Sequence, residues 1–137
     1  MENIIAFDFD GTLTVEDSGG RFLRWNTRMM DRLRYHAAIG HAVIIVTGRH
    51  GEARDRELSA AGYEELQGFP LVHSAVEKFH LPVVGIIFTD GALKGPALVA
   101  LEVSMLYDDQ VEQRMSAVEH GVRARLPVQA EPQLKKT

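Results

Sequence analysis

Short apolar runs that end abruptly at glycine or polar residues are the most regular feature of this chain. Four of them lie at 4–9, 42–46, 83–88 and 104–107, and the first three are rich in β-branched residues. Runs of this length and composition predict strands buried on both faces, because no position along them is reserved for solvent. The segment 122–128 instead alternates apolar and polar residues, which predicts a strand at the edge of a sheet.

Between these runs, apolar residues recur at the spacing of one helix face. A long helix is predicted over 21–38, ended by Gly40. Its apolar positions are Phe22, Trp25, Met29 and Leu33. Further helices are predicted over 51–62, 71–81, 95–103 and 110–121. The segment 11–20 is rich in turn residues, and 129–137 is expected to be a disordered tail.

The alternation of strands and helices predicts the fold class. We expect an α/β protein, with a Rossmann-like, doubly wound parallel sheet and helices on both faces. A chain of 137 residues is long enough for one domain with its own core, which we assign to residues 1–128. In such folds the functional site lies beyond the carboxyl ends of the strands.

Polar residues stand at that edge after each of the four runs. They are Asp8 and Asp10 after the first run, Thr47, Gly48 and Arg49 after the second, Lys94 after the third, and Asp108 and Asp109 after the fourth. Asp90 also follows the third run, where it is expected to be a turn residue.

Asp8 and Asp10 are the most informative pair. One residue separates them, so both side chains point to the same side of an extended strand. Carboxylates this close repel one another, and a hard cation such as Mg²⁺ would relieve the repulsion. Asp8 could then act as a nucleophile and Asp10 as general acid and base. Thr47 and Lys94 suit the oxygens of a phosphoryl group.

Four stretches, in order, resemble the motifs of the haloacid dehalogenase (HAD) superfamily of phosphatases. They are "DFDGTLT", "VIIVTGR", Lys94 before a helix, and "MLYDD", and the resemblance covers about residues 3–120. It implies that Asp8 is the nucleophile and a Mg²⁺ ligand, and that Asp10 is the general acid and base with its backbone carbonyl on the metal. It also implies that Thr47 and Lys94 hold the phosphoryl oxygens. Asp108 would bind Mg²⁺ directly, and Asp109 through water or by orienting the other ligands.

Simpler structural roles stay open for the same residues. A turn or helix cap would explain an isolated Asp or Thr, and a loop lysine is usually solvated. These alternatives apply to Asp8 with Asp10, to Thr47, to Lys94, and to Asp108 with Asp109. Arg49 could reach the substrate with Gly48, or it could pair with an acidic residue.

Members of the HAD superfamily often carry a cap domain over the site, and this chain has little room for one. Only 12–20 lies between Asp10 and the next predicted helix, and only 89–94 follows the third strand. We therefore expect a small, capless type. Its open site would take a large substrate such as a nucleic-acid end, or would be covered by a second copy of the chain, as in tetrameric capless sugar-acid phosphatases. Arginines 21, 24, 28 and 32 form either a solvated helix face or a rim for an anionic substrate.

The composition of the chain limits its possible chemistry, location and partners further. There is no cysteine, which excludes disulfides and thiolate chemistry. The amino-terminal residues lack a secretory signal pattern and no apolar run is long enough to span a membrane, so a cytoplasmic location is expected. The net charge of −4 argues weakly against a dedicated nucleic-acid binder.

The expected function is a Mg²⁺-dependent phosphomonoester hydrolase that acts through a phospho-aspartate on Asp8. Its substrate would be a phosphorylated nucleic-acid end or a phosphorylated sugar or metabolite. A non-catalytic binding or regulatory protein of the same fold, or a phosphotransferase using the same residues, is the alternative.

Overall fold

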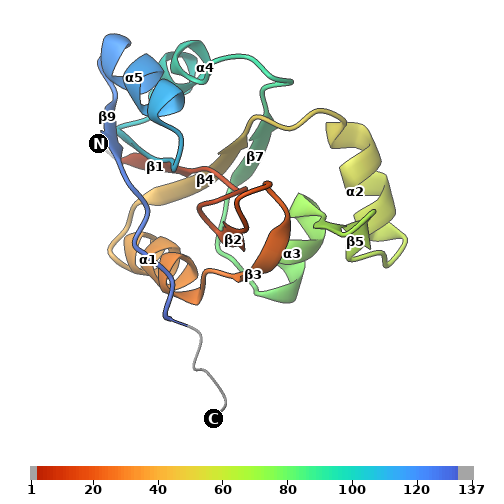
Figure 1. Ribbon diagram of the computed structural model, residues 1–137. Helices are drawn as coiled ribbons and strands as arrows, with labels where there is room; N and C mark the ends of the chain where they lie inside the picture. Colours follow the sequence, from red (N-terminus) through yellow and green to blue (C-terminus); the bar gives the residue numbers. More distant parts are fainter. Residues whose placement is uncertain (1–2, 133–137) are drawn as a thin grey trace.

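A five-stranded parallel sheet forms the centre of the molecule. The computed structural model describes residues 3–132, and its sheet has the order β7-β4-β1-β8-β9 (Figure 1). The strands are β1 (Ile4–Phe7), β4 (Ala42–Thr47), β7 (Gly85–Phe88), β8 (Met105–Tyr107) and β9 (Arg123–Arg125). All neighbouring pairs are parallel, and the alternating segment predicted at 122–128 supplies the edge strand β9.

Helices cover both faces of this sheet, which confirms the predicted fold class. They are α1 (Thr27–Ala38), α2 (Glu52–Ala60), α3 (Val72–Lys78), α4 (Gly95–Ala100) and α5 (Val111–Glu119). Helices α1 and α3 lie on one side of the sheet, and α4 and α5 lie on the other (Figure 1). One buried cluster joins α1 and α3 to β1 and β4, and a second joins α4 and α5 to the opposite face. Ile5 and Phe7 of β1 enter the first cluster while Ala6 enters the second, as the alternation of strand side chains requires.

The helix predicted over 21–38 is wrong in its first turn. Residues 22–25 form β3 (Phe22–Trp25), which pairs antiparallel with β2 (Thr14–Glu16), and α1 begins only at Thr27. Phe22 and Trp25 match a helical spacing by coincidence, because in this hairpin Trp25 packs against the core and Phe22 contacts Trp25, with 5.1 Å between the ring centroids. Trp25 contacts Phe9 edge-on, with 6.1 Å between the ring centroids.

Asp17 closes this β2–β3 hairpin. Its Oδ1 accepts hydrogen bonds from the backbone N–H of Gly19 at 2.8 Å and of Arg21 at 2.9 Å. The sequence "DSGG" between two β-rich stretches is therefore a hairpin signal that outweighs the helical spacing. The four arginines consequently do not share one helix face, since Arg21 precedes β3 and Arg24 lies within it.

A second hairpin lies between α2 and α3, in a segment for which the sequence predicts no element. It consists of β5 (Glu65–Leu66) and β6 (Phe69–Pro70), which pair antiparallel. Each strand is only two residues long, too short for a periodic pattern to register. The two places where a cap domain could be inserted contain the β2–β3 hairpin and the short loop 89–94. Within residues 3–132, neither place therefore contains a domain.

Sequence spacing places Val111, Met115 and Val118 on one side of α5, and that side faces solvent. The helix instead packs through the small residues Ser116 and Ala117. The Ser116 hydroxyl accepts a hydrogen bond from the backbone N–H of Gly95 at 3.0 Å, and a Cβ on that glycine would collide with Ser116. Close approach of α4 to α5 therefore decides which face of α5 is buried.

The segment after β9 runs along the β2–β3 hairpin and α1. Arg24 donates to the carbonyl of Glu131 at 2.9 Å, and the side chain of Asn26 donates to the carbonyl of Val128 at 2.9 Å. Arg28 forms an ion pair with the Glu131 carboxylate at 3.6 Å. Of the tail expected at 129–137, residues 133–137 lie outside the described residues, and its disorder stays a prediction. Within 3–132 no helix has both the length and the apolar character needed to cross a membrane.

The surroundings of His36 on α1 predict that it contributes a pH-dependent part of the stability. Its Nδ1 lies 2.9 Å from Nδ1 of His41, and its Nε2 lies 3.1 Å from the Tyr107 hydroxyl. Burial lowers the pKa of His36 below the usual 6.5, and the adjacent charges of His41, Arg32 and Arg125 lower it further.

Because the pKa of His36 is lower in the folded chain, unfolding takes up a proton between the two pKa values. The contribution of His36 to the free energy of unfolding should therefore rise with pH up to about 6.5, by at most ~1.4 kcal/mol per pH unit. Urea unfolding at pH 5, 6 and 7 should show a smaller slope for His36→Asn than for the wild type. His80→Asn, at an exposed position whose φ of 50° suits asparagine, should keep the wild-type slope. An unchanged slope in His36→Asn would contradict this assignment.

Candidate active site

The carboxyl ends of β1, β4 and β8 meet at one edge of the sheet, and the loop before α4 joins them there. Asp8 follows β1, Thr47 ends β4, Asp108 follows β8, and Lys94 directly precedes α4. A cleft of about 320 Å³ lies among them. It is lined by Asp8, Asp10, Thr47, Gly48, Arg49, Gly91, Lys94, Gln110 and Gln113. The structure therefore brings together six of the eight predicted site residues in one cleft.

A buried ammonium links two of the carboxylates. Lys94 Nζ lies 2.7 Å from Oδ1 of Asp8 and 2.6 Å from Oδ2 of Asp108, and its side chain is only 2% exposed. The backbone N–H of Lys94 donates to the side chain of Gln113 at 2.9 Å, which fixes the start of α4 against α5. Lys94 is thus a buried component of the site rather than a solvated loop lysine.

Burial dominates the electrostatics of this group. It raises the pKa of Asp8 well above its ordinary value, and the Asp108 carboxylate raises it further, against the opposing charge of Lys94. For Lys94, burial alone would lower the pKa, but the two carboxylates reverse this and raise it. Two carboxylates therefore share one ammonium at these strand ends.

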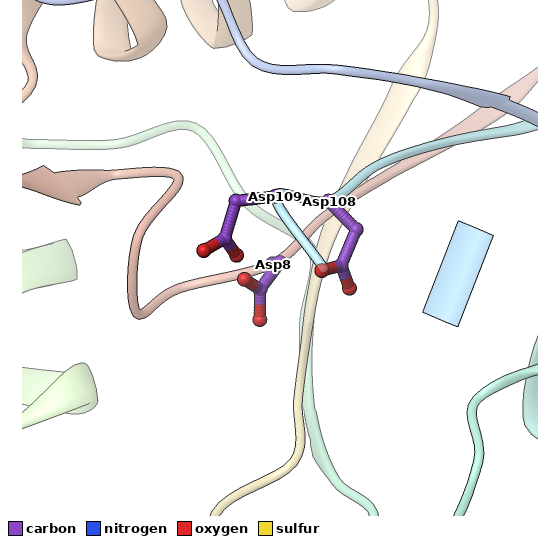
Figure 2. Close-up of side chains that lie close together, drawn as sticks. All are labelled: Asp8, Asp108 and Asp109. Atoms are coloured by element: carbon purple, nitrogen blue, oxygen red, sulfur yellow. The ribbon is translucent and has the colours of Figure 1, made fainter. Parts of the chain in front are cut away.

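Three carboxylates are arranged as a possible metal site. Asp8, Asp108 and Asp109 each offer an oxygen, and these oxygens lie within 4.8 Å of one another (Figure 2). Asp8 and Asp108 are buried, whereas Asp109 is exposed on the solvent side. Oxygen ligands of this kind, with room left for water, are the donor set that Mg²⁺ prefers. The residues present therefore fit the cation that the motif resemblance implies.

Neighbouring groups hold two of these carboxylates in place. The Thr12 hydroxyl donates to Oδ2 of Asp8 at 3.1 Å, and the backbone N–H of Gln110 donates to Oδ1 of Asp108 at 2.9 Å. Neither Thr12 nor Gln110 is among the site residues predicted from the sequence. Thr12 could have been predicted, because it belongs to the "DFDGT" stretch. Gln110 could not, because it acts through its backbone N–H, which every residue type except proline has.

Asp10 lies apart from the metal-type cluster. Its two carboxylate oxygens accept hydrogen bonds from Nε and Nη2 of Arg49, each at 2.7 Å. Arg49 also donates from Nη1 to the carbonyl of Pro70 at 2.6 Å and lies over the ring of Phe9. Of the two roles open to Arg49, pairing with an acidic residue is the one present in this structure.

Thr47 and Gly48 form the floor of the cleft beside Asp8. Thr47 is buried at the end of β4, and its hydroxyl accepts a hydrogen bond from the backbone N–H of Arg49 at 3.3 Å. Gly48 accepts from the backbone N–H of Gly91 at 2.9 Å, which holds the loop after β7 against the loop after β4. Asp90, with a φ of 51°, occupies a turn as expected.

Several solved structures share this arrangement of sheet and helices. A chain of the Pnkp1/Rnl/Hen1 RNA repair complex matches with a TM-score of 0.65 and 18% identity, over 92% of this chain and 42% of that one. The 3-deoxy-D-manno-octulosonate 8-phosphate phosphatase from Moraxella catarrhalis matches with a TM-score of 0.50 and 20% identity, over 88% of this chain and 64% of that one. A hypothetical protein from Xanthomonas campestris matches with a TM-score of 0.53 and 19% identity, over 96% and 66%.

These likenesses concern the fold alone, and together with the sheet order they confirm the α/β fold class that the sequence predicts. The chain spans less than two thirds of the length of each of the first two of these proteins. No protein-family model matches the sequence, and no curated protein matches it.

Gly11 leaves space for the third carboxylate. Its φ is +79°, and a Cβ at this position would collide with the Asp109 carboxylate. Gly40 offers a matched control, because its φ is +95° and nothing lies within 4 Å of a Cβ built there.

We expect Gly40→Ala to lower the free energy of unfolding by about 1 kcal/mol, the cost of a left-handed alanine. Gly11→Ala should lower it by more and should also weaken Mg²⁺ binding, because the added methyl displaces Asp109. Urea unfolding and Mg²⁺ titration of the melting temperature measure the two effects. Equal behaviour of both variants would contradict the role of Gly11 beside Asp109.

Proposed function

We propose that this protein is a Mg²⁺-dependent phosphomonoester hydrolase that works through a covalent phosphoryl-Asp8 intermediate. The observation that carries the proposal is the buried group formed by Asp8, Asp108 and Lys94, with Asp109 beside it. A purely structural role does not explain why two carboxylates and an ammonium are buried at the ends of neighbouring strands. Transfer of a phosphoryl group can use this combination, with a carboxylate as nucleophile and the ammonium beside the phosphoryl oxygens.

Asp8 would bind the phosphoryl group in the first step. One carboxylate oxygen forms a bond to phosphorus while the ester oxygen leaves and takes a proton from Asp10. In the second step Asp10 removes a proton from water as the water oxygen bonds to phosphorus, and the Asp8–phosphorus bond breaks. Inorganic phosphate is released, and both carboxyl groups return to their initial states.

Lys94 and Thr47 would hold the phosphoryl oxygens during both steps. The ammonium and the hydroxyl line the same cleft as Asp8, so they can donate hydrogen bonds to oxygens whose negative charge grows in the transition state. Asp8, Asp108 and Asp109 would hold Mg²⁺, which supplies charge neutralisation at the phosphoryl oxygens. The magnesium and phosphate ions in the Moraxella catarrhalis structure agree with this proposal.

Arg49 would change partner when substrate binds. Both oxygens of Asp10 are engaged by Arg49, so proton transfer from Asp10 requires this ion pair to loosen. A phosphate in the cleft competes for the same guanidinium, because Arg49 lines the cleft together with Gly48. Arrival of the anion would thereby free Asp10 for its role as acid.

Substitution of the nucleophile is the most direct test. Asp8→Asn keeps the shape but removes the attacking charge, so release of phosphate from a generic phosphomonoester should fall at least about a thousandfold. Asp31→Asn, on the exposed face of α1, is the matched control and should keep wild-type turnover. Near-normal turnover in Asp8→Asn would contradict the covalent mechanism.

Metal binding is testable without turnover. Mg²⁺ at about one hundred times its dissociation constant should stabilise the fold by ~2.7 kcal/mol, which raises the melting temperature by several degrees. Asp108→Asn should lose most of this rise while Asp31→Asn retains it. Ca²⁺ should support activity poorly, and excess chelator should abolish it. Full activity in excess chelator would exclude the metal-dependent mechanism.

A further inference from the structure

A second cavity, of about 580 Å³, adjoins the cleft and has no part in the proposed chemistry. Asp10 and Arg49 line both cavities, so the larger one begins beside the group that would protonate the leaving oxygen. Its other walls come from α2, from the β5–β6 hairpin and from the β2–β3 hairpin. Its volume lies within the range of pockets that hold nucleotide-sized ligands. We call it the side pocket.

One wall of the side pocket is apolar. It is formed by Leu58, Leu66, Phe69 and Leu71. Phe69 is 43% exposed and Leu66 is 37% exposed, although both are large apolar residues. A half-exposed aromatic ring beside a reaction site offers a stacking surface for a planar group. A sugar would place hydroxyl groups against this wall without hydrogen-bond partners, which is unfavourable.

Two of the acidic residues that line the side pocket are already paired. Asp10 is held by Arg49. Asp55 accepts hydrogen bonds from the backbone N–H groups of Val72 at 2.8 Å and His73 at 2.9 Å, and its Oδ1 lies 2.7 Å from His73 Nδ1. Asp55 therefore fixes the start of α3 to α2 and does not repel an incoming anion as a free carboxylate would.

Positive charge is available at the rim. Arg54 lines the side pocket from α2, is exposed, and makes no hydrogen bond or ion pair with any residue of the described range 3–132. His50 also lines the pocket, and its Nδ1 lies 3.8 Å from Oδ1 of Asp90. A third acidic residue, Glu16, faces the pocket from β2, and burial together with Asp10 and Asp109 raises its pKa to about 7. A guanidinium without a partner is well suited to a phosphate group.

We propose that the side pocket binds the terminal nucleoside of a phosphorylated single-stranded nucleic acid, with its base against Phe69 and Leu66 and the next phosphodiester at Arg54. The assignment rests on the proposed phosphatase function, because the scissile phosphate at Asp8 positions the strand end. The absence of a cap domain within residues 3–132 leaves the path of the remaining strand open. Ends phosphorylated at the 3′ or the 5′ position share this chemistry, and the substrates below distinguish them.

Comparison of substrates tests the proposal in the wild-type protein with Mg²⁺. The panel contains 3′- and 5′-phosphorylated dinucleotides, the matching mononucleotides, glucose 6-phosphate and a phosphotyrosine peptide. One of the two dinucleotides should have a kcat/KM about tenfold or more above those of glucose 6-phosphate and of its own mononucleotide. Preference for the sugar phosphate or the peptide, or equal turnover of mononucleotide and dinucleotide, would overturn the proposal.

Paired variants locate the contacts. Phe69→Ala should lower the ratio of dinucleotide to glucose 6-phosphate turnover about tenfold, and Phe69→Trp should restore it, because the indole also stacks. Arg54→Gln should weaken the salt dependence of dinucleotide turnover, reducing the slope of log kcat/KM against log salt by ~0.7. Arg56→Gln is its control, because Arg56 pairs with Glu52 at 2.6 Å on α2 and does not line the pocket. Identical effects of the two arginine substitutions would overturn the assignment of Arg54.

Binding of an unphosphorylated, fluorescent dinucleotide separates the pocket from the chemistry. Anisotropy should show binding that Phe69→Ala weakens about tenfold and Arg56→Gln leaves unchanged. Such binding without phosphate release from any substrate would support the side pocket and contradict the phosphatase function. Phosphate release from small phosphomonoesters without dinucleotide binding would overturn the side pocket and leave the phosphatase function standing.

Discussion

The buried contact of Lys94 with Asp8 and Asp108 is the interaction on which the rest of the site depends. Two carboxylates at the ends of neighbouring strands would repel each other strongly in an environment that excludes water. The ammonium, 2.7 Å from one and 2.6 Å from the other, compensates them together. Burial of such charges is costly, so the arrangement is retained only where the surrounding fold holds every partner in place.

The fold supplies this support through helices rather than through the sheet alone. Lys94 is positioned by the start of α4, which is tied to α5 by the hydrogen bonds from Lys94 and Gly95 to Gln113 and Ser116. Because α5 packs through small residues, its start stays close to Asp108, whose carboxylate is held by the N–H of Gln110. The core packing on this face of the sheet therefore sets the geometry of the proposed reaction site.

Arg49 organises the opposite side of the cleft. It contacts Asp10, the ring of Phe9 and the carbonyl of Pro70, and so joins the end of β1 to the β5–β6 hairpin. It also separates the small polar cleft from the larger, partly apolar side pocket. In a fold without a cap domain in its described part, selectivity has to come from such short hairpins. Self-association as a second way of covering the site stays a prediction.

The sequence by itself determined the fold class, the positions of the main strands along the chain and the residues gathered at their ends. Continuous apolar runs specify a sheet covered on both faces, and in a parallel sheet the residues after each strand, such as Asp8 and Thr47, necessarily meet at one edge. The short motif "DFDGT" also constrained the chemistry, since paired carboxylates followed by a tight turn have few structural uses.

Only the tertiary structure decided which partners these residues take. The first turn of the predicted helix at 21–38 became strand β3, because the pairing with β2 and the turn at Asp17 outweigh a local apolar spacing. The pairing of Asp10 with Arg49 and the side-pocket lining join segments far apart in the chain, and the β5–β6 hairpin is too short to show a period. The local pattern of apolar residues predicts which face of a helix or strand is buried. Contacts between segments far apart in the chain depend on how the elements pack, so the local pattern cannot predict them.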